Sequence, residues 1–129
     1  MKQFRDDFED WLDRSLAAEI PASVVAFSFN LFEHSSGASR YGVELIGASE
    51  FDCTDPDWAC SEVWEPENGR SLDIPLMFCD DGWEVCLSRM IDLVKSVMQE
   101  NSPSSEKLRS VRGVGIGFVD GELHLLKSD

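Results

Sequence analysis

The stretch VVAFSFNLFEHSSGASRYGVEL, residues 24–45, decides the fold class. From Val25 onward, large apolar side chains alternate with small or polar ones, which is the two-residue period of a half-buried strand. Residues 41–45 alternate in the same way and predict a second strand. The segment between them, residues 34–39, has the composition of a loop and is too short for a crossover connection. We therefore expect the two strands to pair as an antiparallel hairpin.

The C-terminal residues 113–126 repeat this pattern around a tight turn. Asp120-Gly121 stands between two runs of alternating apolar residues, which is a strong signal for a β-hairpin. Gly115 and Gly117 lie on the same face of the first of these two strands. Because that face carries no side chains at these positions, we expect a helix or another backbone to approach it closely.

Two segments show helical periodicity instead. The first ends near Glu19, because Pro21 cannot continue a helix, and its apolar positions are Phe4, Phe8, Trp11, Leu12, Leu16 and Ile20. The second has the clearest apolar stripe of the chain, formed by Trp83, Cys86, Leu87, Met90, Ile91, Val94, Val97 and Met98. We expect Asp81 to cap this helix, with Glu84 completing a capping box, and Trp83 to lie in the core.

Prolines interrupt residues 48–81, where the apolar pieces predict one strand around Val63 and another over residues 72–78. Residues 106–112 predict a short helical turn. The order of elements is then a helix, two strands, an irregular acidic segment, a helix and two strands. This order favours a single α+β domain over residues 1–129, with an antiparallel sheet of four to six strands and two main helices packed on it.

The chain of 129 residues carries 25 acidic and 11 basic side chains, a formal net charge of −14. Such a charge argues against direct electrostatic attraction to nucleic acid or to an anionic membrane, and it suits a positively charged protein partner. Residues 1–13 are charged and amphipathic and lack the apolar centre of a signal peptide, and no stretch is long enough to span a bilayer. We therefore expect a cytoplasmic location.

The four cysteines predict neither a disulfide framework nor a metal site. Cys53 and Cys60, like Cys79 and Cys86, have the spacing C-x6-C, which is too wide for the close pair of a zinc knuckle. A cytosolic location disfavours structural disulfides. Because Cys86 lies on the apolar stripe of the second helix, we expect it to be a small buried hydrophobic residue.

No motif in the chain indicates catalysis. The glycine run at residues 113–117 lies inside a strand pattern and does not open a helix, so it is not a phosphate-binding loop. The two histidines, His34 and His124, are not paired with a nucleophile in sequence, and a G-x-S-x-G elbow is absent. The acidic residues near Asp55 lack the spacing and the glycine of an EF-hand. We expect no catalytic residue, no metal and no cofactor.

The acidic side chains are concentrated in one part of the chain. Residues 50–84 contain eleven carboxylates and a single base, Arg70, so this segment carries −10 of the net charge of −14. Trp58 and Trp64 lie within the segment, and aromatic residues concentrate binding energy at the centres of interfaces. The alternative is that both rings are core residues with a solvated rim of acids. We predict a partner-binding surface formed by Glu50, Asp52, Asp55, Asp57, Trp58, Glu62, Trp64, Glu65 and Glu67.

A small, strongly acidic α+β domain without a catalytic motif resembles the immunity proteins of bacterial contact-dependent and polymorphic toxin systems. The resemblance rests on the overall character of the chain and on no specific motif. It implies a tight one-to-one complex with a cognate toxin domain, often a basic nuclease, in which carboxylates replace the phosphates of the toxin's substrate. Our leading hypothesis is therefore an inhibitory binding protein for a basic protein partner, and not an enzyme.

Two other functions remain open at this point. The aromatic and glycine residues of the predicted strands suggest a small-molecule or regulatory domain with its pocket on the sheet face, at Phe27, Phe29, Tyr41, Gly115 and Gly117. A sheet face packed solid by the helices would remove this hypothesis. An enzyme that uses Cys53 or Cys60 with a distant histidine is the third hypothesis.

Overall fold

The computed structural model describes residues 2–17, 19–36, 39–66, 71–79, 82–119 and 121–128. Its elements are the helices α1 (Lys2–Ala17), α2 (Leu76–Cys79), α3 (Trp83–Met98) and α4 (Pro103–Ser110), the 3-10 helix η1 (Pro56–Cys60), and the strands β1 (Ala26–Ser36), β2 (Ser39–Ala48), β3 (Glu62–Trp64), β4 (Ser71–Pro75), β5 (Gly113–Phe118) and β6 (His124–Ser128). The fold is α+β, as the sequence predicts.

The strands form one six-stranded sheet in the order β3-β2-β1-β5-β6, with β4 also paired to β2. Both predicted hairpins, β1–β2 and β5–β6, are antiparallel. The expectation of a purely antiparallel sheet is wrong at one place, because β1 and β5 run parallel and pair from Ala26 with Gly113 to Leu31 with Phe118. Between the two hairpins the chain crosses the sheet through α3 and α4, and such a helical crossover allows parallel pairing.

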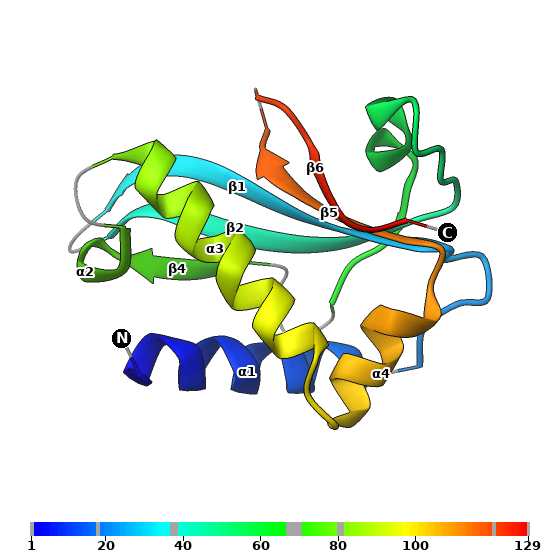
Figure 1. The fold of residues 1–129 in the computed structure, drawn as a ribbon, viewed down its shortest axis with the longest axis horizontal. Helices are drawn as coiled ribbons and strands as arrows, with labels where there is room; N and C mark the ends of the chain where they lie inside the picture. Colours follow the sequence, from blue (N-terminus) through cyan, green and yellow to red (C-terminus); the bar gives the residue numbers. More distant parts are fainter. Residues whose placement is uncertain are drawn as a thin grey trace.

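One face of the sheet is covered by helices (Figure 1). There α1, α3 and α4 pack on β1, β2, β4 and β5 around a core that contains Phe8, Phe27, Phe29, Met90 and Ile116. Phe8 and Phe29 meet with ring centroids 6.0 Å apart. Near the ends of these helices, the Arg5 guanidinium of α1 donates a hydrogen bond to the carboxylate of Glu100, which follows α3, at 2.5 Å. The helices are thereby fixed on the sheet by apolar burial and by a polar link at their ends.

The opposite face is covered near one end by the segment that joins β2 to β3. Phe51 and Trp58 from this segment pack on Ala26, Ile46 and Ala48 of the central strands. The bare glycine face of β5 makes this possible, because a Cβ atom on Gly115 would lie 3.2 Å from Cζ2 of Trp58. On Gly117 it would lie 2.2 Å from the carbonyl oxygen of Glu122. The predicted close approach of another backbone is confirmed at Gly117, whereas side chains of Leu123 and Trp58 cover Gly115.

Several predicted boundaries differ from the observed ones. The expected loop at residues 34–39 is shorter, because β1 continues to Ser36 and β2 begins at Ser39. The expected strand over residues 72–78 divides into β4 and α2. The helical turn expected at residues 106–112 is α4, which begins at Pro103 after a Ser102 cap. The Ser102 hydroxyl accepts a hydrogen bond from the Ser105 N–H, a cap that was not predicted.

The beginning of α3 differs most from expectation. Its N-cap is Gly82 and not Asp81, which lies outside the described residues. Trp83 is the first helical residue, and it is 53% exposed instead of lying in the core. A helical side chain covers the turn on the N-terminal side of its own Cα, and for Trp83 that turn lies beyond the helix. The buried stripe therefore begins one turn later, at Cys86.

Cys79 and Cys86 form a disulfide, which corrects the expectation that the chain has none. The end of α2 lies beside the first turn of α3, with the two Cα atoms 4.1 Å apart. Both residues are fully buried, as predicted for Cys86. The pair fastens the short helix α2 to α3.

Candidate functional site

The predicted acidic residues belong to one closed loop. The chain leaves β2 at Ala48 and returns in β3, where Glu62 pairs with Ala48, and the Ser49 N–H donates to the carbonyl of Ser61 at 3.0 Å. Six of the predicted carboxylates are exposed on this loop and on β3, and we call them the acidic surface: Glu50, Asp52, Asp55, Asp57, Glu62 and Glu65. Glu67, the seventh, lies outside the described residues.

Hydrogen bonds within the loop hold several of these carboxylates in place. Asp55 caps η1 by accepting the Asp57 N–H at 3.0 Å, and Glu50 accepts from the Ser61 hydroxyl. Asp52 accepts from the Thr54 hydroxyl at 2.7 Å and from the Thr54 N–H at 2.9 Å. These two hydrogen bonds hold the pKa of Asp52 below its ordinary value of 3.8, and the bond from the hydroxyl has the larger effect. The loop therefore presents its charges in a fixed arrangement.

Trp58 does not belong to the contact surface that we predicted. It is only 3% exposed, and its ring packs on Phe51 with centroids 5.2 Å apart. Its indole Nε1–H is buried and finds no hydrogen-bond partner among the described residues. The physical reason is the glycine face of β5, which leaves room for a large ring under η1. Trp58 thus anchors residues 49–61, which we call the acidic loop, to the sheet.

Trp64 is half-buried, and its ring meets Phe27 of the main core at 5.9 Å, edge to face. It packs beside the strand pair at Gly47, where a Cβ atom would lie 3.2 Å from the indole. The neighbouring Val63 is 48% exposed on the same strand. The exposed apolar part of β3 is therefore mainly Val63, which the sequence analysis did not include among the site residues.

The fold also brings a base to the acidic surface from a distant part of the sequence. Arg112, just before β5, lies with its guanidinium 5.8 Å from the centre of the Phe51 ring. Its charge contributes to the lowered pKa of Asp52. Residues 50–84, whose one base in the sequence is Arg70, thus have Arg112 as a basic neighbour in the folded protein.

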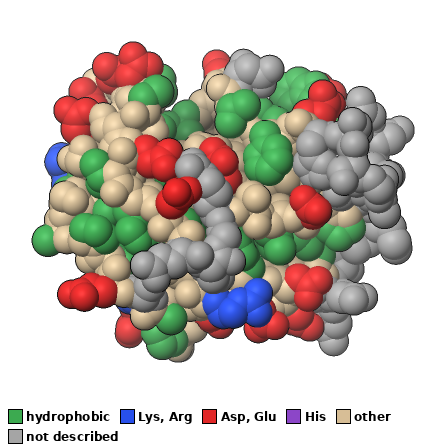
Figure 2. Space-filling model, turned by 180° about the vertical axis from the view of Figure 1, so that it is seen from behind, with side chains coloured by type: hydrophobic (Ala, Val, Ile, Leu, Met, Phe, Trp, Pro, Cys, Tyr) green, Lys and Arg blue, Asp and Glu red, His purple; other side chains and the backbone are tan. Residues whose placement is uncertain are grey.

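Seen from behind, the molecule carries acidic side chains over much of its surface (Figure 2). They lie at the upper left of this view, the side on which η1 lies, and also in its centre, on its right and along its lower edge, whereas Lys and Arg appear toward the lower and left edges.

The sheet-face pocket considered as a second hypothesis is filled. Phe27 and Phe29 are buried under the helices, and Trp58, Leu123 and the backbone of Glu122 cover Gly115 and Gly117. Of the five residues, Tyr41 lines a cavity at the end of the sheet, and Gly117 lines a hollow beside the final hairpin. The helices fill one face of the sheet, so no pocket on that face remains for the second hypothesis.

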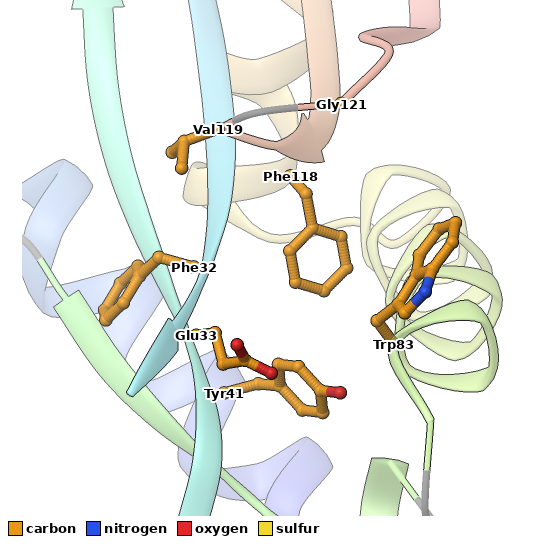
Figure 3. Close-up of a pocket in the computed structure, with 7 residues that line it drawn as sticks. All are labelled: Phe32, Glu33, Tyr41, Trp83, Phe118, Val119 and Gly121. Atoms are coloured by element: carbon orange, nitrogen blue, oxygen red, sulfur yellow. The ribbon is translucent and has the colours of Figure 1, made fainter. Parts of the chain in front are cut away.

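The cavity beside Tyr41 lies at the end of the sheet and was not predicted. It has a volume of about 500 Å³ and is lined by Phe32, Glu33, Tyr41, Trp83, Phe118, Val119 and Gly121, and we call it the aromatic pocket (Figure 3). β5 ends at Phe118 opposite Leu31, whereas β1 continues to Ser36, so β1 has no β5 partner beyond this point. The pocket occupies the space left beside β1.

Three rings of the pocket form a connected set. Phe118 meets Tyr41 at 5.6 Å and Trp83 at 5.9 Å, both edge to face. Figure 3 shows the Tyr41 phenol pointing toward the side where Trp83 stands, with the Glu33 carboxylate beside the Tyr41 ring. The pocket therefore combines aromatic walls with a carboxylate.

A second hollow, of about 750 Å³, lies between the final hairpin and η1. Its wall includes Pro56, Asp57 and Cys60 of the acidic loop. It shares Phe118, Val119 and Gly121 with the aromatic pocket. The two hollows therefore adjoin each other at these three residues.

Among the residues with described positions, no group of three His, Cys, Asp or Glu side chains is placed to hold a metal ion. Cys53 and Cys60 are exposed free thiols, and the His34 side chain lies outside the described part. None of the helices in the described ranges is long and apolar enough to cross a membrane. Comparison with protein-family models, curated proteins and solved structures finds no match to this chain.

Proposed function

We propose that this protein binds and neutralises a basic protein partner through the acidic surface, without catalysing a reaction. The supporting observation is the set of six exposed carboxylates, four on the loop between β2 and β3 and two at Glu62 and Glu65, beside a loop that packs on the sheet through the buried rings of Phe51 and Trp58. Clustered charge of one sign raises the rate of association with an oppositely charged protein by about ten- to a thousandfold at low salt. The resemblance to bacterial immunity proteins suggests a toxin domain, such as a nuclease, as the partner.

The construction of the loop favours tight binding as well as fast association. Phe51 and Trp58 fix the loop from below, and the bonds at Glu50, Asp52 and Asp55 fix it from within. A surface that is ordered before binding loses less conformational entropy on association than a mobile one. Val63, exposed beside Glu62, adds an apolar contact at the edge of the charges.

The experiment begins with capture of partners on the immobilised chain at low salt, followed by elution with a salt gradient. The eluted protein is then tested against a variant with charge reversals at Asp55, Asp57, Glu62 and Glu65. We expect the partner to be basic, and we expect its affinity and the salt dependence of its association rate to fall sharply in the variant. Unchanged affinity and salt dependence would sink the proposal.

A further inference from the structure

We propose that the aromatic pocket receives an arginine side chain of the same basic partner. This inference rests on the proposed function, because it assigns the pocket to the partner that the acidic surface attracts. It concerns a separate site, formed by Phe32, Glu33, Tyr41, Trp83 and Phe118.

The chemistry of the pocket fits a guanidinium group. Ring faces attract cations, and tryptophan does so best, while arginine also stacks on aromatic planes. A carboxylate such as Glu33 accepts two parallel N–H bonds from a guanidinium. An ammonium group is more strongly hydrated and lacks the planar fork, so arginine suits aromatic walls beside one carboxylate better than lysine.

The exposure of the pocket fits a protein ligand. Trp83 is 53% exposed and Val119 is 65% exposed at its rim. Large apolar side chains at the mouth of a pocket mark sites of protein contact, and tryptophan is enriched among residues that dominate binding energy. The rim is also well fixed, because the Val119 N–H donates to the carbonyl of Leu31 at 2.9 Å.

The position of the pocket connects it to the acidic surface. The second hollow has Asp57 on its wall and shares Phe118, Val119 and Gly121 with the pocket. The hollow that Asp57 lines therefore adjoins the pocket that Trp83 lines. Charge complementarity and continuity with the acidic surface both favour an arginine from this partner as the occupant.

The test uses the isolated chain and the blocked peptide acetyl-Gly-Arg-Gly-amide, followed by the tryptophan indole signals in proton–nitrogen NMR spectra. The Trp83 signal is assigned by its loss in Trp83→Leu. We expect the peptide to shift this signal, and Glu33→Gln to weaken binding about fivefold through loss of the charge-assisted bonds. Glu106→Gln, an exposed carboxylate on α4, and Leu125→Ala, an exposed apolar residue on β6, are the controls and should leave the affinity unchanged.

Matched peptides identify the chemistry of the ligand. The citrulline peptide, which is neutral and nearly isosteric, should not bind, and the lysine peptide should bind more weakly than the arginine peptide. The proposal is overturned if the citrulline or the lysine peptide binds as tightly as the arginine peptide. It is also overturned if the arginine peptide leaves the Trp83 signal unshifted. Choline binding more tightly than the arginine peptide overturns it too, in favour of a small quaternary ammonium ligand.

The two proposals fail separately. At 1 M salt, where the Debye length is about 3 Å, neutralising the acidic surface should leave binding of the arginine peptide within about twofold of the native protein's binding at the same salt. If the peptide binds but the charge reversals leave the partner's affinity unchanged, the proposed function fails and the pocket stands. If Trp83→Leu and Glu33→Gln leave the partner's affinity unchanged, the pocket proposal fails and the function stands.

Discussion

The Phe51 ring occupies the space that a side chain at Gly113 would fill, since a Cβ atom on Gly113 would lie 2.0 Å from Cε1 of Phe51. This contact joins the acidic loop to the first residue of β5. The position of the carboxylates therefore depends on a glycine more than fifty residues away in sequence. The glycines of β5 thus support the acidic surface, although β5 itself contributes no carboxylate to it.

Gly113→Ala should displace Phe51 and loosen the acidic loop. We expect a loss of about 1–3 kcal/mol in the free energy of unfolding, the usual cost of overpacking a filled site. Denaturant unfolding measures it. The control is Gly121→Ala, where the new methyl would meet its nearest neighbour at 3.6 Å, and it should change stability by less than about 0.5 kcal/mol. Equal effects of the two substitutions would contradict the account.

Trp58 should tolerate loss of its N–H but not loss of its ring. Within the described part of the chain the buried Nε1–H has no hydrogen-bond partner, and an unsatisfied buried donor costs about 1–3 kcal/mol. Trp58→Phe removes this cost along with some volume, so we expect nearly unchanged stability. Trp58→Ala leaves a cavity and should cost about 3–5 kcal/mol. Calorimetric unfolding compares the two, and a phenylalanine variant as unstable as the alanine variant would show that the N–H has a partner.

Thr54→Val should raise the pKa of Asp52 toward its ordinary value of 3.8, because the hydroxyl is the largest cause of the lowered pKa. The pKa should stay somewhat low, since the Thr54 N–H still donates. Thr54→Ser keeps a hydroxyl and should keep the low pKa. Carboxyl carbon NMR during acid titration measures all three proteins, and an unshifted pKa in Thr54→Val would refute the assigned cause.

The hydrogen bond from the Thr54 hydroxyl to Asp52 also determines whether the free energy of unfolding rises or falls with pH. A carboxyl group whose pKa is lowered by folding contributes stability above its unfolded pKa and loses it as the pH falls through the folded pKa. The advantage of the native protein over Thr54→Val should therefore be complete above pH 3.8 and disappear below it. An advantage that grows on acidification would contradict this sign.

The sequence predicts the elements whose signals are local. The β1–β2 and β5–β6 hairpins follow from two-residue alternation around short turns, and the stripe from Cys86 to Met98 identifies α3. The parallel pairing of β1 with β5 follows from packing between segments more than eighty residues apart, which no local pattern records. The periodicity of apolar residues along the chain is therefore enough to predict the fold class, but it does not predict the order of the strands in the sheet.

The candidate site shows the same division. The acidic surface is visible in the sequence because its carboxylates are neighbours along the chain. The role of Trp58 is not, because the acids around it suggest exposure while the glycines that bury it lie in β5. Trp83 continues an apolar stripe, but the helix begins at that residue and β5 ends beside it, at Phe118. The aromatic pocket combines four separate segments and has no signal along the chain.

The central claim is tested most directly by two variants of equal charge. One carries Asp55→Asn, Asp57→Asn, Glu62→Gln and Glu65→Gln, and the other carries Asp6→Asn, Asp7→Asn, Asp10→Asn and Asp92→Asn, all at exposed positions on α1 and α3. The rate of association with the captured basic partner is measured against salt concentration. We predict that the first variant associates about tenfold or more slowly at low salt with a flattened salt dependence, and that the second stays close to the native protein. Equal rates for the two variants would contradict a located acidic binding surface.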